Sequence, residues 1–296
     1  MFTPLPDTFS QQKPAFQQIY VESHAGELIQ GPWRYGDGSA GKVLVTLRTR
    51  SLMTTHLITE EHPSRDTPSL MPKTLFLRNS LNKLYGIKNR DLHIERVSNI
   101  PVGKGLGSST SDLLSFAKNY LAYHDIYPEE NDIFRIATES ERYSDPLYST
   151  RNFLFNSGDK TELVKYPSLG IIGCALIVFS KCIESIDTDS LSSDYSTDYI
   201  MKFSTVLALT EAAFSAGNSR LLMRAAMASA RLNQDRIKLW DLEELWAKAQ
   251  KLSLGFSVSH SGTAMVFHMP DFESLYKVKH LMESAGYDGI EIKTYF

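Results

Sequence analysis

The residues with the clearest chemical character form a loop rich in glycine and hydroxyl side chains, PVGKGLGSSTSD at residues 101–112. Its three glycines permit positive φ angles and let backbone N–H groups approach a ligand closely. The hydroxyl residues lie where a helix is expected to begin, and a helix N-terminus has unsatisfied N–H groups and a partial positive charge. The pattern predicts an anion site, most simply for phosphate. The plain alternative is a capping box with Ser109 as N-cap and Asp112 bonding back to it.

The loop matches neither of two common phosphate-binding loops. In a Walker A loop the lysine follows the last glycine and precedes Ser or Thr, whereas Lys104 precedes two of the three glycines. The dinucleotide fingerprint needs a third glycine at the position of Ser108, and repeated parallel strand-helix-strand units are also missing. A different kind of phosphate site is therefore expected.

The elements around the loop place it at a strand-loop-helix junction. LHIERV at 92–97 alternates apolar and polar residues before the loop, and apolar residues recur at helical spacing from Leu113 to Leu121 after it. Other strands are predicted at 19–22, 42–48, 51–59, 171–179 and 290–295, with a hairpin between 42–48 and 51–59 and a strand-turn-strand at 256–267. Other helices are predicted at 74–85, 132–141, 201–216, 221–232, 242–252 and 272–285. A polar stretch at 159–168 that contains a proline suggests a domain boundary.

Length and composition exclude several classes of protein. A chain of 296 residues can form two lobes, and 31 Lys and Arg against 34 Asp and Glu leave a net charge of −3, which gives no basic footprint for nucleic acid. The N-terminus has no secretory signal pattern, and the longest apolar run, 171–179, is too short to cross a membrane. We expect a cytoplasmic protein without a membrane partner. Cys174 and Cys182 lie in or beside that run and suggest reduced thiols.

Three motifs together resemble one family. PVGKGLGSST resembles the second signature of the GHMP small-molecule kinases, P-x-x-x-G-L-G-S-S-A-A, which galactokinases and homoserine, mevalonate and phosphomevalonate kinases share. GELIQG at 26–31 resembles the first motif of a GHMP branch, the L-threonine kinases of cobalamin assembly, and SHSGT at 259–263 resembles that branch's third motif. The branch usually has SCGELIQG where this chain has Ser23-His24-Ala25-Gly26. A serine- and aspartate-rich connector at 187–198 is a second departure.

The resemblance implies an α+β, two-lobed GHMP kinase fold. Residues 1–160 would form an N-terminal lobe like ribosomal protein S5 domain 2, and residues 161–296 a ferredoxin-like lobe. The implied activity is transfer of phosphate from ATP, with Mg²⁺, to the side-chain hydroxyl of L-threonine or a related hydroxy-amino acid. The alternative is a catalytically inactive protein of this fold that binds a nucleotide or metabolite and regulates a partner. The resemblance leaves a homodimer open.

The resemblance also implies a nucleotide and metal site. The residues that would contact ATP are Pro101, Gly103, Lys104, Gly105, Leu106, Gly107, Ser108, Ser109 and Thr110. Mg²⁺ needs oxygen ligands, which the hydroxyl of Ser108 or Ser109 and a carboxylate would supply. Glu141 is favoured slightly over Glu139 for that carboxylate. Lys104 has the alternative of a solvated loop lysine, and helix-end glutamates are usually solvated too.

Asp145 is the acid to which the resemblance assigns the chemistry. SDPLY at 144–148 aligns with T-D-S-T-L-F of the threonine kinases, so Asp145 would accept the hydroxyl proton or orient the nucleophile. Ser-Asp-Pro is also ordinary turn chemistry. Arg142 and Arg151 flank it and are either anion partners or surface ion-pair residues.

Four residues from the first and third motifs are predicted to bind substrate: Glu27, His260, Ser261 and Gly262. Glu27 could bind an ammonium group, with a strand-end ion pair to a lysine as the alternative. A metal role is not expected for His24 or His260, because neither has a second ligand at metal-binding spacing nearby in the sequence.

Overall fold

The structure is a computed structural model that describes residues 18–36, 40–60, 70–149, 151–169, 172–179, 195–237, 242–259, 261 and 263–295. The elements of the N-terminal half are β1 (Val21–Arg34), β2 (Ala40–Thr59), α1 (Pro72–Tyr85), β3 (His93–Ser98), α2 (Ser108–Tyr123), α3 (Glu130–Ala137), β4 (Asn152–Asn156) and β5 (Thr161–Tyr166). Those of the C-terminal half are β6 (Ile172–Phe179), α4 (Thr197–Ser215), α5 (Ser219–Ile237), α6 (Leu242–Ala249), β7 (Gly255–Val258), β8 (Ala264–Met269), α7 (Phe272–Ser284) and β9 (Gly289–Tyr295).

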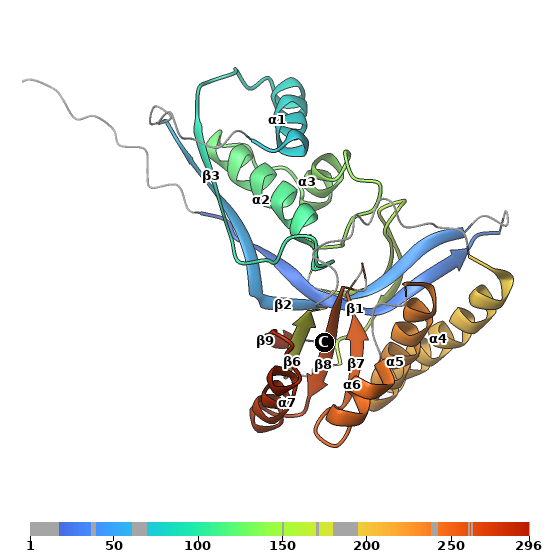
Figure 1. Ribbon diagram of the computed structural model, residues 1–296. Helices are drawn as coiled ribbons and strands as arrows, with labels where there is room; N and C mark the ends of the chain where they lie inside the picture. The colour runs from blue at the N-terminus through green and yellow to red at the C-terminus, as the bar shows by residue number, and fades with distance from the viewer. Residues whose placement is uncertain are drawn as a thin grey trace, which may run out of the picture.

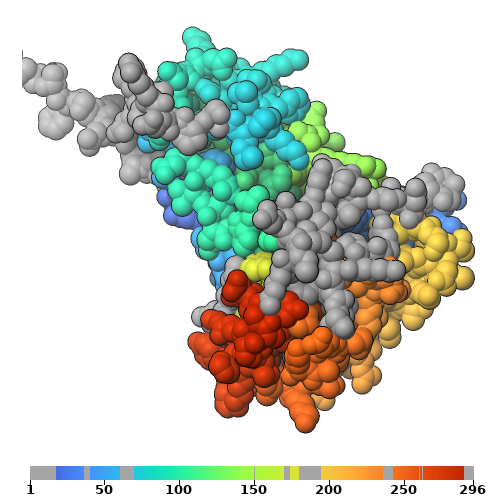
Figure 2. Space-filling view, viewed as in Figure 1, coloured from blue at the N-terminus to red at the C-terminus, as the bar shows by residue number. Residues whose placement is uncertain are grey.

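A long antiparallel pair, β1 and β2, runs through both halves of the molecule. The strands pair in the order β1-β7-β8-β6-β9-β2-β4-β5, while β3 pairs with β2 and β1 also pairs directly with β2. Figure 1 shows α1, α2 and α3 on one side of the β1–β2 ribbon, and β6 to β9 with α4 to α7 on the other. The same division is visible on the surface, from blue and green to yellow and red (Figure 2). The β1–β2 ribbon therefore connects the two halves.

Three hydrophobic cores stabilise the molecule: one lies within each half, and the third is shared by β1 and β2 with β6, β8, α4 and α5. In the N-terminal half, α2 buries Phe116 and Tyr120 completely against β2, α1 and α3, which is why its apolar residues recur around most of the helix. In the C-terminal half, β6 is buried on both faces, because Ala175 and Ile177 enter one core and Leu176 and Val178 enter another. Alternate residues of a strand point to opposite faces, so a strand between two cores reads as a continuous apolar run.

Several predicted elements are confirmed and one predicted turn is wrong. The strand predicted at 92–97 is β3, and the helix predicted at 74–85 is α1, which ends at the left-handed Gly86 (φ 65°). The hairpin predicted between 42–48 and 51–59 does not exist, because β2 is one continuous strand of 20 residues. β2 pairs with β1 from Ala40 to Thr54, and the register of this pair shifts three times between Glu22 and Ile29. These irregularities let one long pair bend without a turn.

The segment after α2 differs from the prediction in two places. The helix predicted at 132–141 is α3, which ends at Ala137, so the residues leading to Glu141 form a turn. Strands β4 and β5 were not predicted, and the boundary proposed between residues 160 and 161 falls in the turn that joins them. Cys174 is a buried free thiol, whereas Cys182 lies outside the described residues. Among the helices that the structure describes, none has the length and apolar character needed to cross a bilayer.

Candidate active site

The glycine loop joins β3 to α2 and leaves the start of α2 without a side-chain cap. Gly103, Gly105 and Gly107 all have left-handed backbone angles, with φ of 71°, 66° and 74°. The N-cap of α2 is Gly107, and no side chain accepts a hydrogen bond there. The first N–H groups of a helix have no partner within the helix, so these groups are available to an anion.

The capping box considered for Ser109 and Asp112 is therefore wrong. Asp112 faces β3 instead, where its Oδ1 lies 2.7 Å from Nε of Arg96. Ser109 donates its hydroxyl to Glu141 instead. The partner of Asp112 is therefore an arginine on a neighbouring strand rather than the backbone of its own helix.

The glycine loop packs directly against the first and third motifs. A Cβ on Gly105 would lie 2.5 Å from Oγ and 2.6 Å from N of Ser261, and a Cβ on Gly107 would lie 2.7 Å from Nε2 of His24. Likewise, a Cβ on Gly26 of the first motif would lie 3.2 Å from Cα of Ser259 in the third motif. Three motifs that are far apart in the sequence thus meet at positions that only glycine fits without displacement.

Glu141 is the buried carboxylate beside the N-terminus of α2. It accepts hydrogen bonds from Oγ of Ser109 at 2.5 Å and Oγ1 of Thr110 at 2.8 Å, and Nζ of Lys73 lies 3.9 Å away. Burial raises the pKa of Glu141, against the two hydroxyl donors and Lys73. Glu139 is exposed, so Glu141 alone of the two candidate carboxylates faces the glycine loop. A buried carboxylate beside an uncapped helix N-terminus suits a cation bound together with an anion.

Asp145 lies in the turn after Glu141 and is held at two points. Its backbone N–H donates to Oγ1 of Thr110 at 3.4 Å, and its Oδ2 lies 3.3 Å from Nε2 of His24. Its side chain is 13% exposed. The carboxylate is therefore both accessible and oriented, as proton transfer to or from a ligand requires.

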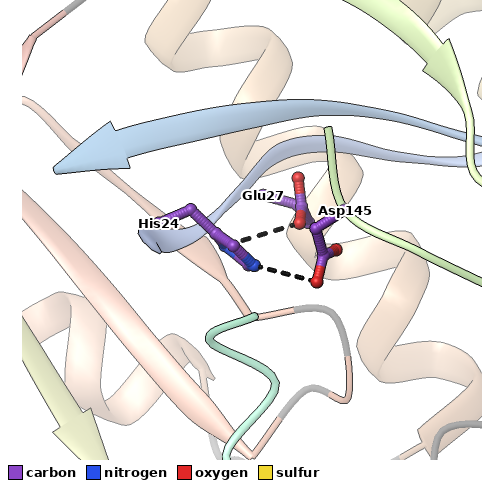
Figure 3. A group of neighbouring side chains, drawn as sticks. All are labelled: His24, Glu27 and Asp145. Atoms are coloured by element: carbon purple, nitrogen blue, oxygen red, sulfur yellow. Dashed lines mark ion pairs between the residues drawn. The ribbon is translucent and has the colours of Figure 1, made fainter. Parts of the chain in front are cut away.

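His24 and Glu27 complete a cluster with Asp145 that sequence reasoning missed (Figure 3). Both side chains are fully buried, and Nδ1 of His24 lies 3.6 Å from Oε1 of Glu27. Burial lowers the pKa of His24, but the carboxylates of Asp145 and Glu27 outweigh it and the net pKa is raised. Burial, opposed by His24 and reinforced by Asp145, raises the pKa of Glu27 to about 7.

The cluster has the residue types of a metal site, but its hydrogen bonding favours a different state. Nδ1 of His24 accepts a hydrogen bond from the backbone N–H of Gly26 at 3.0 Å. That contact puts the ring proton on Nε2, the nitrogen that faces Asp145. A metal-bound histidine usually donates its second N–H to an acceptor, and here the second nitrogen receives a donor.

Comparison with known proteins identifies the fold. Residues 74–150 match the model of the GHMP kinases N terminal domain, while the sequence has no match among curated proteins. A mevalonate kinase structure matches with a TM-score of 0.70 at 11% identity, over 94% of this chain and 99% of that one. The chain has the GHMP kinase fold. The predicted α+β, two-lobed class is therefore confirmed.

Two other GHMP kinase structures match over similar lengths. Streptococcus pneumoniae phosphomevalonate kinase, in complex with phosphomevalonate and AMPPNP, has a TM-score of 0.64 at 13% identity, over 93% of this chain and 99% of that one. Homoserine kinase from Cytophaga hutchinsonii has a TM-score of 0.64 at 16% identity, over 95% of this chain and 96% of that one. The identities are too low to transfer a substrate, so the acceptor has to be argued from the site.

The structure describes only some of the other residues that were predicted for the site. Ser261 is buried, and its Oγ lies 2.8 Å from Oγ1 of Thr263. His260 and Gly262 lie outside the described residues. Leu106 is 1% exposed and anchors the glycine loop in the core, while the hydroxyl of Ser23 donates to its carbonyl oxygen.

The two arginines that flank Asp145 in the sequence point elsewhere. The guanidinium of Arg142 stacks over the ring of Tyr143, with 5.1 Å between Cζ and the ring centroid. Arg151 is exposed and lines a separate open cavity of about 920 Å³, beside Leu147 and Tyr148. The imidazole of His24 on β1, rather than either arginine, therefore faces the carboxylate of Asp145.

Proposed function

We propose that this chain is an ATP- and Mg²⁺-dependent kinase that phosphorylates the side-chain hydroxyl of a small metabolite, L-threonine or a related hydroxy-amino acid. One observation carries the proposal: an uncapped helix N-terminus, a buried carboxylate and an oriented aspartate meet within one hydrogen-bonded group. Thr110 links them, because its hydroxyl donates to Glu141 and receives the N–H of Asp145. Phosphoryl transfer requires mainly this kind of positioning and charge neutralisation.

The glycine loop would bind the triphosphate. Backbone N–H groups from Gly105 to Ser109 would donate to the β- and γ-phosphates, aided by the partial positive charge of the α2 N-terminus. Lys104 would add a point charge at the mouth of the site. The AMPPNP complex of S. pneumoniae phosphomevalonate kinase, which has the same fold, supports ATP as the phosphate donor.

The carboxylate of Glu141 and the hydroxyl of Ser108 or Ser109 have the donor chemistry of a magnesium site, and of the two serines Ser109 contacts Glu141. The carboxylate of Glu141 is buried, faces the start of α2 and already receives two hydroxyl donors. Both groups supply the oxygen ligands that Mg²⁺ prefers. When bound, the ion would neutralise charge on the transferring phosphate.

Asp145 would accept the proton of the acceptor hydroxyl. The hydroxyl proton moves to a carboxylate oxygen of Asp145 as the oxygen attacks the γ-phosphorus, and the bond from that phosphorus to the β,γ-bridging oxygen breaks to release ADP. Asp145 then returns the proton to solvent, so the enzyme ends in its starting state. The 13% exposure of its side chain is compatible with both contacts.

The acceptor class rests on the groups beside Asp145. Neither carboxylate oxygen of Glu27 has a hydrogen-bond partner among the described residues. The side chain is fully buried and pairs with His24, so an ammonium group would reach Glu27 by taking the place of that pair. The buried hydroxyl of Ser261 adds a polar contact on the third-motif side. An ammonium group and a nearby hydroxyl are the features of a hydroxy-amino acid.

An ADP-release assay with threonine, serine, homoserine and sugar alcohols tests the proposal. We expect ATP- and Mg²⁺-dependent turnover with threonine or a close relative, and turnover only with sugar alcohols would overturn the acceptor class. Calorimetric titration with ATP and Mg²⁺ separates the alternatives. Nucleotide binding without transfer to any acceptor would favour the non-catalytic regulator, and absence of binding would contradict both.

A further inference from the structure

We infer that His24 is a positioning residue that orients Asp145 through its Nε2–H and links that aspartate to the glycine loop. The inference rests on the proposed function, because it assigns a role within the same site. It is specific to the sequence SHAGELIQG at 23–31, which places a histidine before the first motif.

The tautomer of His24 is set by the backbone. Nδ1 accepts the N–H of Gly26 at 3.0 Å, so the neutral ring carries its proton on Nε2. Gly26 can make this contact because its φ is 115°, within the register shift of β1 between His24 and Glu27. The Nε2–H faces Oδ2 of Asp145 at 3.3 Å. This pair directs Oδ2 of Asp145 toward the ring of His24.

The ring of His24 also lies against the phosphate loop. A Cβ on Gly107 would lie 2.6 Å from Cδ2 and 2.7 Å from Nε2 of His24, so only a glycine allows this close approach. The neighbouring Ser23 hydroxyl donates to the carbonyl of Leu106 in the same loop. His24 is therefore packed between the N-cap of α2 and Asp145, and a shift of either would be transmitted to the other.

A second contact holds the backbone of Asp145. Its backbone N–H donates to Thr110 in the first turn of α2. With the side chain facing His24 and the backbone bonded to Thr110, the carboxylate direction is determined from both β1 and α2. Loss of the side-chain contact alone would free the carboxylate while the loop backbone stays in place.

The test compares two polar replacements of His24 with a matched control. The amide nitrogen of glutamine can occupy the position of Nε2, whereas that of asparagine reaches only to the position of Nδ1. We expect His24→Asn to lower kcat about 10- to 100-fold with KM for ATP nearly unchanged, and His24→Gln to retain most of kcat. His56→Gln is the control, because His56 is another buried histidine on the neighbouring strand but contacts Ser115 instead. Equal loss in His24→Gln and His24→Asn, or equal loss in the control, would overturn the inference.

A double-mutant cycle separates orientation from a general structural effect. If His24 acts through Asp145, His24→Asn causes no further loss in an Asp145→Asn background. Additive losses would contradict the inference. If the chain phosphorylates none of the acceptors, ¹⁵N NMR of the imidazoles still tests it. At pH values above the raised pKa of His24 we expect the Nε2–H tautomer, with a ring shift that changes in Asp145→Asn. An Nδ1–H tautomer would overturn the inference.

Discussion

His24 of β1 and His56 of β2 are both buried, yet their surroundings drive their pKa values in opposite directions. Burial, reinforced by the positive charge of Arg96, lowers the pKa of His56 to about 4. Its Nδ1 lies 3.1 Å from Oγ of Ser115 and its ring meets Phe116 edge-on at 5.7 Å, so it is a neutral core residue. Around His24, two carboxylates outweigh the same burial and raise the pKa.

The difference shows where this fold tolerates buried charge. Beside α2 and β2, His56 contacts the neutral hydroxyl of Ser115, and the acid Asp112 pairs directly with the guanidinium of Arg96. Where the three motifs converge, the fold instead places two carboxylates, Glu27 fully buried and Asp145 13% exposed, beside one imidazole. Glu27 has no hydrogen-bond partner among the described residues. Concentration of perturbed groups at one place is typical of functional sites. Matched substitutions in the two regions can test that contrast.

The largest difference is expected between two aspartates. Asp145→Asn removes the proton acceptor, and we expect kcat to fall about 10²- to 10⁴-fold with ATP binding retained. Asp112→Asn breaks only the partly exposed pair with Arg96 and is expected to leave kcat within about 2-fold, with at most about 1 kcal/mol of stability lost. ADP release and titration calorimetry measure both effects. Similar losses of kcat in the two variants would remove the distinction between the regions.

The free energy of unfolding is expected to change with pH in opposite directions in the two regions. Glu27 provides the test in the first region. Its pKa is raised from 4.5 to about 7 on folding, so its contribution is fully favourable below pH 4.5 and is lost as the pH rises through 7. The change is on the order of 3 kcal/mol. Glu27→Gln should remove it and flatten the fall in unfolding free energy between pH 5 and 8. Urea titrations across that range measure the slope, and an unchanged slope would count against the buried, protonated Glu27.

His56 should give the opposite slope. Its pKa falls from 6.5 to about 4 on folding, so its contribution is present above pH 6.5 and is lost as the pH falls toward 4. The loss approaches about 3 kcal/mol. His56→Gln should reduce acid destabilisation between pH 6.5 and 4 in the same urea titrations. A variant with the acid sensitivity of the parent would show that the ring is protonated in the folded state.

The smallest difference is expected between two glycines with the same backbone angle. Gly105 (φ 66°) would place a Cβ 2.5 Å from Oγ of Ser261, whereas Gly86 (φ 65°) has nothing within 4 Å. Gly86→Ala should cost about 1 kcal/mol from the left-handed angle alone. Gly105→Ala adds overpacking of about 2 kcal/mol and should weaken ATP binding. Thermal unfolding and calorimetry compare them, and equal stabilities would mean that the contact with the third motif relaxes freely.

Local patterns predicted most of the elements that carry the site. The alternation of LHIERV and the helical spacing after the glycine loop depend on residues close in sequence, and both elements are present as β3 and α2. The hairpin between 42–48 and 51–59 was wrong, because the polar residues between them resemble a turn but stay in a strand paired to β1. The capping box failed for a similar reason: Arg96, on another element, attracts Asp112 more strongly than a neutral N–H does.

The sequence by itself determined the residue types of a phosphate loop, because glycine angles and helix-start chemistry are local properties. It also determined the likeness of three motifs to GHMP kinases, because each motif is a short contiguous segment. Only the tertiary structure decided that Glu141 rather than Glu139 faces the loop, and that His24 lies between Asp145 and Gly107. Those contacts depend on a bulged strand and on a turn that lies far along the chain. No local pattern encodes such proximity, because it arises when a core shared by both halves brings the motifs together.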